Sequence, residues 1–200
     1  MQPLINNLGV QDKKLKLDEL GRMDVKSFKE GDKHPITVVL DNVRSAINVG
    51  SIFRTCDALA VERIILLGIT PCPPHREILK SAIGATETVD WVHMESNEDL
   101  FEYCQERDLK IFSVEQTANS KGVEIFNNSF PMAVVFGNEV EGVQQEIIDK
   151  SYASVELPQY GTKHSFNVSV CAGIVLWEGV KSFISQKNKV LRIVFFGLLN

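Results

Sequence analysis

The sequence predicts an α/β domain in which helices cover both faces of a parallel sheet. Three observations support this fold class. Short β-branched and apolar runs recur along the chain, segments with helical spacing separate them, and polar or Gly-containing loops follow several of the runs. With 200 residues, 44% of them hydrophobic and 24% charged, the chain suits one domain with a well-buried core.

Six runs are predicted to be strands, because each is short and largely apolar, as strands buried on both faces are. They are residues 36–40, 63–67, 88–94, 110–114, 132–136 and 153–157. Five other segments have the spacing or the start signals of helices. They are residues 48–59, 76–85, 96–107, 143–149 and 166–184.

Two capping signals refine the predicted helix starts. Asn48 is a candidate N-cap for the helix over 48–59. Ser96, with Asp99 three residues later, resembles a capping box in which Asp replaces the usual Glu or Gln. Both signals predict helices that begin directly after a loop.

The chain is predicted to have three parts. A polar N-terminal extension covers residues 1–34, the α/β domain covers 35–185, and a basic and apolar tail covers 186–200. Within the extension, helical spacing is carried by Leu15, Leu17, Leu20 and Met23.

The charge is distributed unevenly. A net charge of −5 argues against a nucleic-acid partner, but residues 179–200 carry four Lys or Arg and no acid, whereas residues 36–178 hold ten basic and twenty acidic residues. The basic C-terminal part is either a docking surface for an anionic partner or a solvated helix face.

Several classes of protein are disfavoured. No positively charged segment followed by an apolar run marks a signal peptide, and the apolar stretch 193–199 is shorter than the ~20 residues that span a bilayer. Four widely spaced cysteines without a CxxC pair favour reduced thiols in a cytoplasmic protein. The histidines show no metal-ligand spacing, so no metal site is expected.

The first candidate site is the segment 41–54, which follows the first strand and opens the first helix. Free N–H groups at a helix N-terminus attract anions, and Gly50 would let a backbone approach closely. Arg44 and Arg54 add donors for phosphate or planar polar groups. A capped helix with surface arginines would account for the same residues.

The second candidate site is the loop 136–142, which follows an apolar strand. Gly137 and Gly142 have the spacing of a phosphate-binding P-loop, but Val143 and Gln144 stand where Lys and Ser or Thr are required. No GxGxxG follows the first strand, which disfavours a dinucleotide site. Two carboxylates in the loop suggest ligand contact, although a plain turn is an alternative.

The third candidate site is the segment 157–169, where a strand ends at a Pro- and Gly-containing loop and a long apolar helix follows. If that helix begins near Ser165, then Ser165 and Ser169 share a face, and Asn167 points elsewhere. A capped core helix is the alternative. Lys163 and His164 in the loop are candidate phosphate contacts.

Taken together and in this order, the three segments resemble the signature motifs of the SpoU (TrmH-like) branch of the SPOUT superfamily of RNA 2′-O-ribose methyltransferases. The resemblance covers residues 36–184, and its specificity comes from three motifs in sequence. The motifs are Asn48-x-Gly50-x-x-x-Arg54, then Phe136-Gly137-Asn138-Glu139 with Gly142, then Leu157-Pro158-x-x-Gly161-x-x-x-Ser165-Phe166-Asn167-Val168-Ser169-Val170.

The resemblance implies a SPOUT fold with a C-terminal deep trefoil knot, an exception to the rule against threaded chains. It also implies a homodimeric enzyme that uses S-adenosyl-L-methionine to methylate a ribose 2′-hydroxyl of RNA. The implied cofactor-binding residues are Gly137, Leu157, Phe166, Glu115 and Gln116. The implied catalytic residues are Arg54, Asn48, Glu139, Ser165 and Asn167. Candidate RNA contacts are Arg44, Lys163 and His164.

Methyl transfer from a sulfonium is consistent with these residue types. The leaving group departs neutral, so neither a metal nor an acid is required, and positioning supplies most of the rate gain. Because arginine is normally always protonated, we expect Arg54 to stabilise the developing alkoxide or to hold the adjacent phosphate rather than to act as a base.

This chain departs from the family pattern at three positions. Leu157 stands where Ile is commoner, Gln159 where Met is frequent, and Phe166 where Leu is frequent. We expect the phenyl ring to reshape the adenine pocket without abolishing it. The sequence lacks the long N-terminal RNA-binding domain of many rRNA-modifying relatives, which favours tRNA over rRNA as the expected substrate.

Three other functions fit parts of the sequence. A SPOUT enzyme that methylates a base is disfavoured by Asn48 and Arg54, which are characteristic of the ribose-modifying branch. A catalytically silent RNA-binding protein on the same fold is disfavoured because Arg54, Glu139 and Asn167 are all present. Without the resemblance, the sequence indicates only a nucleotide-binding α/β protein.

Overall fold

The computed structural model describes residues 14–197 of a chain that divides into two compact units, Met1–Gly31 and Asp32–Asn200. In the first unit a 3-10 helix, η1 (Leu17–Leu20), ends at Gly21, and helix α1 (Val25–Glu30) begins after the N-cap Asp24. The leucine spacing in the extension therefore corresponds to a single 3-10 turn and not to a longer helix.

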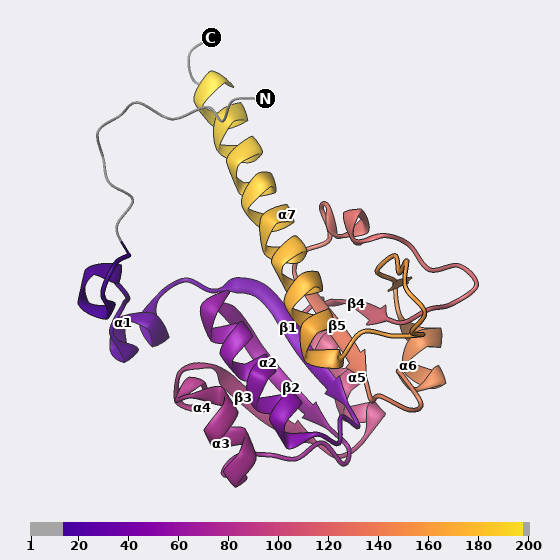
Figure 1. Ribbon diagram of the computed structural model, residues 1–200. Coiled ribbons are helices and arrows are strands. Elements are labelled where there is room, and N and C mark those ends of the chain that lie inside the picture. The colour runs from indigo at the N-terminus through magenta and orange to yellow at the C-terminus, as the bar shows by residue number, and fades with distance from the viewer. Residues whose placement is uncertain (1–13, 198–200) are drawn as a thin grey trace, which may run out of the picture. The chain divides into compact units, whose positions relative to one another are not determined.

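The second unit is built on one parallel sheet of six strands in the order β3-β2-β1-β5-β4-β6 (Figure 1). The predicted strands all form, with ends shifted by up to two residues. Their bounds are β1 (His34–Asp41), β2 (Val61–Leu67), β3 (Asp90–Met94), β4 (Lys110–Val114), β5 (Met132–Gly137) and β6 (Ala153–Val155).

The strand order reverses direction in the middle of the sheet. The chain moves from β1 outward to β2 and β3, crosses to the other side of β1 to form β4, and then places β5 between β1 and β4 and β6 outside β4. In the register of β1 with β5, Asp41 lies beside Gly137 at the carboxyl ends of both strands. Open α/β sheets bind ligands outside such a reversal point.

Helices cover both faces of the sheet, which confirms the predicted fold class. The alternation of side chains along β1 sends Val38 and Leu40 to one face and Val39 to the other. The helices on the two faces are α2 (Ala46–Ala58), α3 (Arg76–Ala82), α4 (Ala85–Thr88), η2 (Val123–Phe126) and α7 (Val168–Gly197) on the first, and α5 (Asn97–Glu106) and α6 (Gln145–Lys150) on the second.

Helix boundaries lie within two residues of the prediction except at the ends of the predicted helices 76–85 and 166–184. The predicted helix 76–85 stops at Ala82, because Ile83 and Gly84 adopt left-handed conformations with φ of 50° and 86°. The capping box is confirmed, since Ser96 and Asp99 exchange side-chain and backbone hydrogen bonds at the start of α5.

Helix α7 is longer than predicted. It begins at Val168 and continues to Gly197, beyond the predicted end at 184 and through the predicted start of the tail (Figure 1). One face of its first half packs on the sheet through a set of buried apolar residues. They are Ala172, Val175, Leu176 and Val180.

By length and composition alone, the stretch Val168–Lys189 of α7 could cross a membrane. The apolar stretch 193–199 noted in the sequence is too short to do so. Core helices of ordinary domains satisfy the same criterion as Val168–Lys189. Since Val168–Lys189 contributes buried residues to the main core, its apolar character has a structural cause within the domain.

Candidate active site

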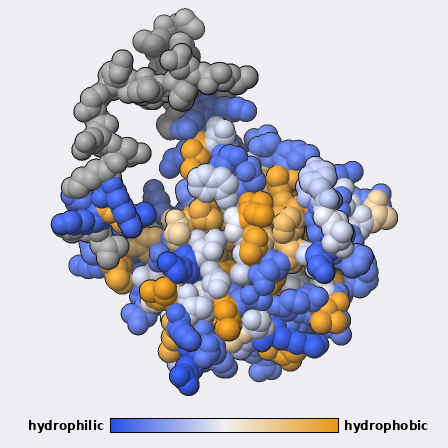
Figure 2. All heavy atoms as spheres, in the orientation of Figure 1, coloured by the Kyte–Doolittle hydropathy of each residue, from blue (hydrophilic) through white to orange (hydrophobic). Residues whose placement is uncertain are grey.

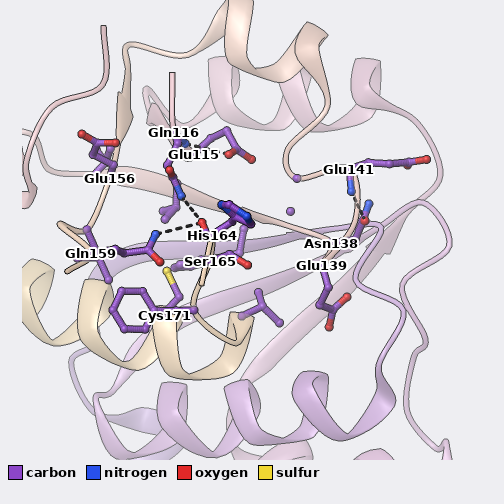
Figure 3. A pocket seen from close by; sticks show the side chains of 18 of the residues that line it. Glu115, Gln116, Asn138, Glu139, Glu141, Glu156, Gln159, His164, Ser165 and Cys171 are labelled. Carbon is purple, nitrogen blue, oxygen red and sulfur yellow. Dashed lines mark hydrogen bonds between the residues drawn. The ribbon is translucent and has the colours of Figure 1, made fainter. Parts of the chain in front are cut away.

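A cavity of about 340 Å³ opens at the carboxyl ends of β4, β5 and β6, where the loops after these strands meet the start of α7 (Figure 3). Its size is within the range of small-molecule sites. The predicted cofactor residues Gly137, Leu157, Phe166, Glu115 and Gln116 all line it. Predicted residues from three separate segments are thereby brought to one place.

The loop after β5 is folded tightly against itself. Oδ1 of Asn138 accepts hydrogen bonds from the N–H groups of Val140 and Glu141, at 2.9 and 2.8 Å, and the N–H of Gly142 donates to the Asn138 carbonyl at 3.1 Å. A Cβ on Gly137 would lie 2.0 Å from the carbonyl carbon of Gly142. Only glycine at 137 therefore permits this loop.

Two carboxylates fix the exit of the same loop. Glu115, after β4, accepts from the N–H of Val143 at 3.0 Å and from the N–H of Gln116 at 2.9 Å. Asp41, fully buried at the end of β1, accepts from the backbone N–H of Gln144 at 2.7 Å and from its side-chain amide at 2.6 Å. The predicted cofactor residue Glu115 thus also positions the loop after β5.

The loop after β6 is held by glutamines. Nε2 of Gln116 donates to the His164 carbonyl at 2.8 Å, and Nε2 of Gln159 approaches the same oxygen at 3.4 Å (Figure 3). Gln159, the residue that departs from the common family pattern, therefore supports the loop from within the cavity.

A chain of hydrogen bonds joins all three motifs. Nδ2 of Asn48, on α2, donates to Oε1 of Glu139 at 2.7 Å, across 91 residues of sequence. Nδ2 of Asn167 donates to Oδ1 of Asn48 at 3.2 Å, across 119 residues. The predicted catalytic residues Asn48, Glu139 and Asn167 therefore form one continuous polar group beside the cavity.

Asn167 is also the residue that starts α7. Its Oδ1 accepts from the N–H and hydroxyl of Ser169 at 3.0 and 2.7 Å, as an N-cap side chain does. The backbone becomes helical at Val168, so the condition that the helix begins near Ser165 is not met and Ser165 does not share a helix face with Ser169. Ser165 instead lines the cavity from the loop, exposed to solvent.

Two details of the first motif also require correction. Asn48 is not the N-cap of α2; Ser45 is, and its Oγ accepts from the Asn48 N–H at 3.3 Å. Gly50 does not face a ligand. A Cβ there would lie 2.5 Å from the Ile78 carbonyl oxygen, so Gly50 allows α2 and α3 to pack closely.

Arg54 lies apart from the cavity in a single chain. It is exposed on α2 and borders a second cavity, together with Gly173 and Trp177 of α7. Its guanidinium forms no ion pair or hydrogen bond with any residue that the structure describes. The structure therefore groups four of the predicted catalytic residues around one cavity and places Arg54 on a neighbouring surface.

The predicted RNA contacts lie at the edge of the cavity. Arg44 is exposed, with its Nη2 4.0 Å from Oε2 of Glu141. Lys163 is exposed and has no ion-pair partner within the described part of the chain. His164 lines the cavity and uses its backbone carbonyl to fix the loop.

The lining of the cavity is acidic. Four carboxylates contribute to it and no lysine or arginine appears among its described lining residues; the carboxylates are Glu115, Glu139, Glu141 and Glu156. Such a site favours a cationic ligand and disfavours phosphate-bearing nucleotides. This charge pattern agrees with the absence of the P-loop lysine in the sequence.

Cys171, on the first turn of α7, lines the cavity and is partly buried. Burial, together with the smaller effect of the negative charge of Glu115, raises the pKa of this thiol from 9.0 to about 11. Since only the thiolate is a good nucleophile, the side chain stays unreactive near neutral pH.

We expect iodoacetamide to alkylate Cys171 about 100-fold more slowly at pH 8 than a thiol of pKa 9.0, because the thiolate fraction falls ten-fold per unit of pKa. The rate should rise continuously as the pH approaches 11. Peptide mass spectrometry of timed samples measures it. Alkylation at pH 8 as fast as that of an exposed thiol would contradict the assignment.

The sequence analysis assigned no role to three residues that shape the site, although Asn138 belongs to the second motif. Asp41 and Gln144 fix the loop after β5 by hydrogen bonds, and Asn138 closes its turn. The only signal for Asp41 was a carboxylate placed directly after a buried strand. Among the side chains that the structure describes, no group of His, Cys, Asp and Glu could hold a metal ion.

Residues 35–177 of the chain match the SpoU rRNA methylase family. The chain belongs to this family. One relative of this SpoU protein is the tRNA (guanosine(18)-2′-O)-methyltransferase of Thermus thermophilus, 29% identical over 146 residues, which are 72% of this chain and 73% of the relative. Another is the 23S rRNA (guanosine-2′-O-)-methyltransferase RlmB of Neisseria meningitidis, 28% identical over 158 residues, which are 78% of this chain and 62% of the relative.

Solved structures are similar to this SpoU protein over most of its length. The Aquifex aeolicus TrmH/SpoU tRNA modifying enzyme has a TM-score of 0.73 at 24% identity, with 82% of each chain covered. The AdoMet-bound rRNA methyltransferase of Sinorhizobium meliloti has a TM-score of 0.70 at 26% identity, with 75% of this chain and 57% of that chain covered. The predicted family, the SPOUT knot fold and the class of RNA methyltransferase are confirmed.

Proposed function

We propose that this protein transfers the methyl group of S-adenosyl-L-methionine to a ribose 2′-hydroxyl of tRNA, as a homodimer. Membership of the SpoU family makes it an RNA 2′-O-methyltransferase that uses this donor. The observation that carries the proposal is the hydrogen-bonded group of Asn48, Glu139 and Asn167, which connects helix α2 to the loop that lines the cavity.

The cavity suits the methyl donor chemically. The donor carries a sulfonium and an ammonium cation, and the lining offers carboxylates without any lysine or arginine among the described residues. Gly137 itself lines the cavity, and a Cβ at this position would clash with the backbone of Gly142. Leu157 and Phe166 provide apolar walls for a planar base.

When bound, the donor supplies a methyl group on a sulfonium that leaves as a neutral thioether. The protein contributes the geometry of the attack and the fate of the hydroxyl proton. Glu139 and Asn167, held by Asn48, position the ribose, and Ser165 lies on the loop at the same opening. An arginine close to the reacting oxygen would stabilise the developing negative charge while the proton passes to solvent.

The site of one chain lacks that arginine, which supports the proposal of a homodimer. Arg54 borders Trp177 on α7, whose outward face carries a row of exposed apolar residues. They are Val170, Ile174, Trp177 and Ile184, with exposed fractions of 52%, 39%, 53% and 45%. Figures 1 and 2 have the same orientation. In Figure 1, α7 crosses the front of the domain, and in Figure 2 apolar side chains gather in the middle of the surface.

A second copy is the simplest partner for this face. Contiguous apolar surface on a helix marks an interaction site, and a two-fold dimer pairs the same face with itself. Arg54 of each protomer would then lie against the partner rather than against solvent. The catalytic site would be complete only in the dimer.

Transfer RNA is favoured as the substrate because the tRNA-modifying Thermus relative is matched over 73% of its length, against 62% for the rRNA-modifying Neisseria relative. Ribosomal RNA is the second candidate, supported by that relative and by the family to which the chain belongs. The two relatives are almost equally identical to this chain, so identity does not separate the candidates.

Mass-spectrometric mapping of ribose methylation tests the proposal in cells with and without the gene. We expect one methylated nucleotide to disappear from the tRNA pool and none from rRNA. A loss confined to rRNA would replace the proposed substrate, and a lost base methylation would replace the reaction. Unchanged RNA, together with no calorimetric binding of S-adenosylhomocysteine at millimolar concentration, would indicate a silent RNA-binding protein.

A further inference from the structure

The loop between β6 and α7 displays an aromatic side chain that nothing in the described structure covers. Tyr160 is 96% exposed and makes no hydrogen bond or ring contact with a described residue. The other tyrosines have partners. The ring of Tyr103 lies 4.0 Å from the Arg107 guanidinium, and Tyr152 packs 5.5 Å from Phe112.

The backbone that carries Tyr160 is fixed on both sides. Leu157 and Gln159 precede it and face the cavity, while the His164 carbonyl is held by Gln116 and approached by Gln159. Asn167 then caps α7. Tyr160 therefore stands on a constrained loop with its side chain turned to solvent, which reduces the entropy lost when a partner packs against it.

Tyr160 lies on a stretch whose two neighbouring residues line the cavity. Gln159 and Ser165, which flank the stretch 160–164, both line the cavity. A ribose that reaches a methyl donor in the cavity would therefore lie near the residues on both sides of this stretch. Lys163, exposed and without an ion-pair partner among the described residues, lies three residues from Tyr160.

We propose that Tyr160 stacks on an RNA base next to the methylated nucleotide, while Lys163 pairs with a neighbouring phosphate. This rests on the proposed function, because it requires an RNA substrate. Proteins that bind unpaired RNA combine aromatic stacking with basic side chains in this way. A positive charge is also needed here because the adjacent cavity is acidic, and its carboxylates would otherwise repel the RNA backbone. Tyr160 is thus a positioning residue for the substrate.

The test uses the full-length protein, tritiated S-adenosylmethionine, and unfractionated tRNA and rRNA from cells that lack the gene. Tyr160→Ala is expected to raise the KM for RNA roughly ten-fold or more, the loss expected for one stacked base. Its kcat and its affinity for S-adenosylhomocysteine should stay within two-fold. Tyr160→Phe should restore the KM, because the phenyl ring still stacks.

Tyr152→Ala is the matched control, since Tyr152 is 62% exposed but packs on Phe112. It should leave the KM for RNA unchanged. Lys163→Ala should weaken RNA binding and reduce the slope of log affinity against log salt concentration by about 1, the change expected when one phosphate contact is lost. Filter binding of the same RNA pools gives the affinities independently of turnover.

Three results would overturn the assignment of Tyr160. They are an unchanged RNA affinity in Tyr160→Ala, failure of Tyr160→Phe to restore it, and a change in oligomeric mass in Tyr160→Ala, which would place the ring in a protein contact. If the wild-type protein methylated neither pool, the proposed function would fail. Filter binding would still decide whether the ring contacts RNA.

Discussion

Replacing Arg54 with alanine is expected to lower kcat by about 10²- to 10³-fold, the typical effect of removing one donor from a developing oxyanion. Affinity for S-adenosylhomocysteine should not change, because Arg54 does not line the cavity that we propose as the cofactor site. Single-turnover methylation of substrate RNA measures the first quantity, and calorimetry measures the second.

Arg76→Ala is the control for loss of an exposed arginine, since Arg76 lies at the start of α3 away from both cavities. It should retain full turnover. Arg54→Lys should recover only part of the activity, because an ammonium lacks the planar donor pair of a guanidinium. Near-full turnover in Arg54→Lys or in Arg54→Ala would remove Arg54 from the mechanism.

The same variant tests whether Arg54 acts across a dimer. Arg54→Ala has an intact cavity, and Gly137→Val has an intact Arg54, so each should be inactive alone. If Arg54 serves the partner's cavity, an equimolar mixture with exchanged subunits should regain about a quarter of wild-type activity. About half of the dimers would be heterodimers, and each heterodimer would have one working site of two. Mixtures that stay inactive, although mass spectrometry shows heterodimers, would contradict action across the dimer.

Gly137→Ala is expected to weaken binding of S-adenosylhomocysteine by about 10- to 100-fold and to destabilise the protein by about 1–3 kcal/mol. The added Cβ would lie 2.0 Å from a backbone carbon of Gly142 and 2.2 Å from the Val143 nitrogen, so the loop must move. Calorimetry and urea unfolding measure the two effects.

Gly161→Ala is the matched control, because a Cβ at Gly161 has no atom within 4 Å. Gly161 belongs to the third motif, yet its substitution should change cofactor affinity and stability very little. If Gly161→Ala and Gly137→Ala lost the same cofactor affinity, the loss could not be attributed to the close contact between Gly137 and Gly142. Wild-type affinity in Gly137→Ala would exclude the loop after β5 from the cofactor site.

The sequence was sufficient to predict the sheet and the location of the site for a physical reason. Continuous β-branched runs such as those in β1 and β5 suit strands buried on both faces, and polar loops after parallel strands meet at one edge. The cofactor residues predicted from the family resemblance line the observed cavity. Their individual roles remain predictions.

What the sequence could not supply depends on contacts between distant segments. No local pattern indicates that Asn48 bonds Glu139 across 91 residues, or that Gly50 packs on the Ile78 carbonyl rather than facing a ligand. The position of Arg54 on the α7 side of α2 was likewise invisible, because spacing along a helix does not reveal which neighbour each face meets. The end of α7 was missed because the polar stretch 185–189 interrupts the apolar pattern, whereas the helix continues to Gly197.

The hydrogen bond between Asn48 and Glu139 has a consequence for how the two substrates influence each other. Glu139 belongs to the loop that would close on the methyl donor, and Asn48 belongs to the helix that would face RNA. If the loop moves when the donor binds, this hydrogen bond would pass the movement to Asn48, and we expect the two binding free energies to be coupled. Such coupling is reciprocal by thermodynamic necessity. Whatever factor the donor adds to the affinity for RNA, RNA adds to the affinity for the donor, and breaking this one bond should make the two bind independently.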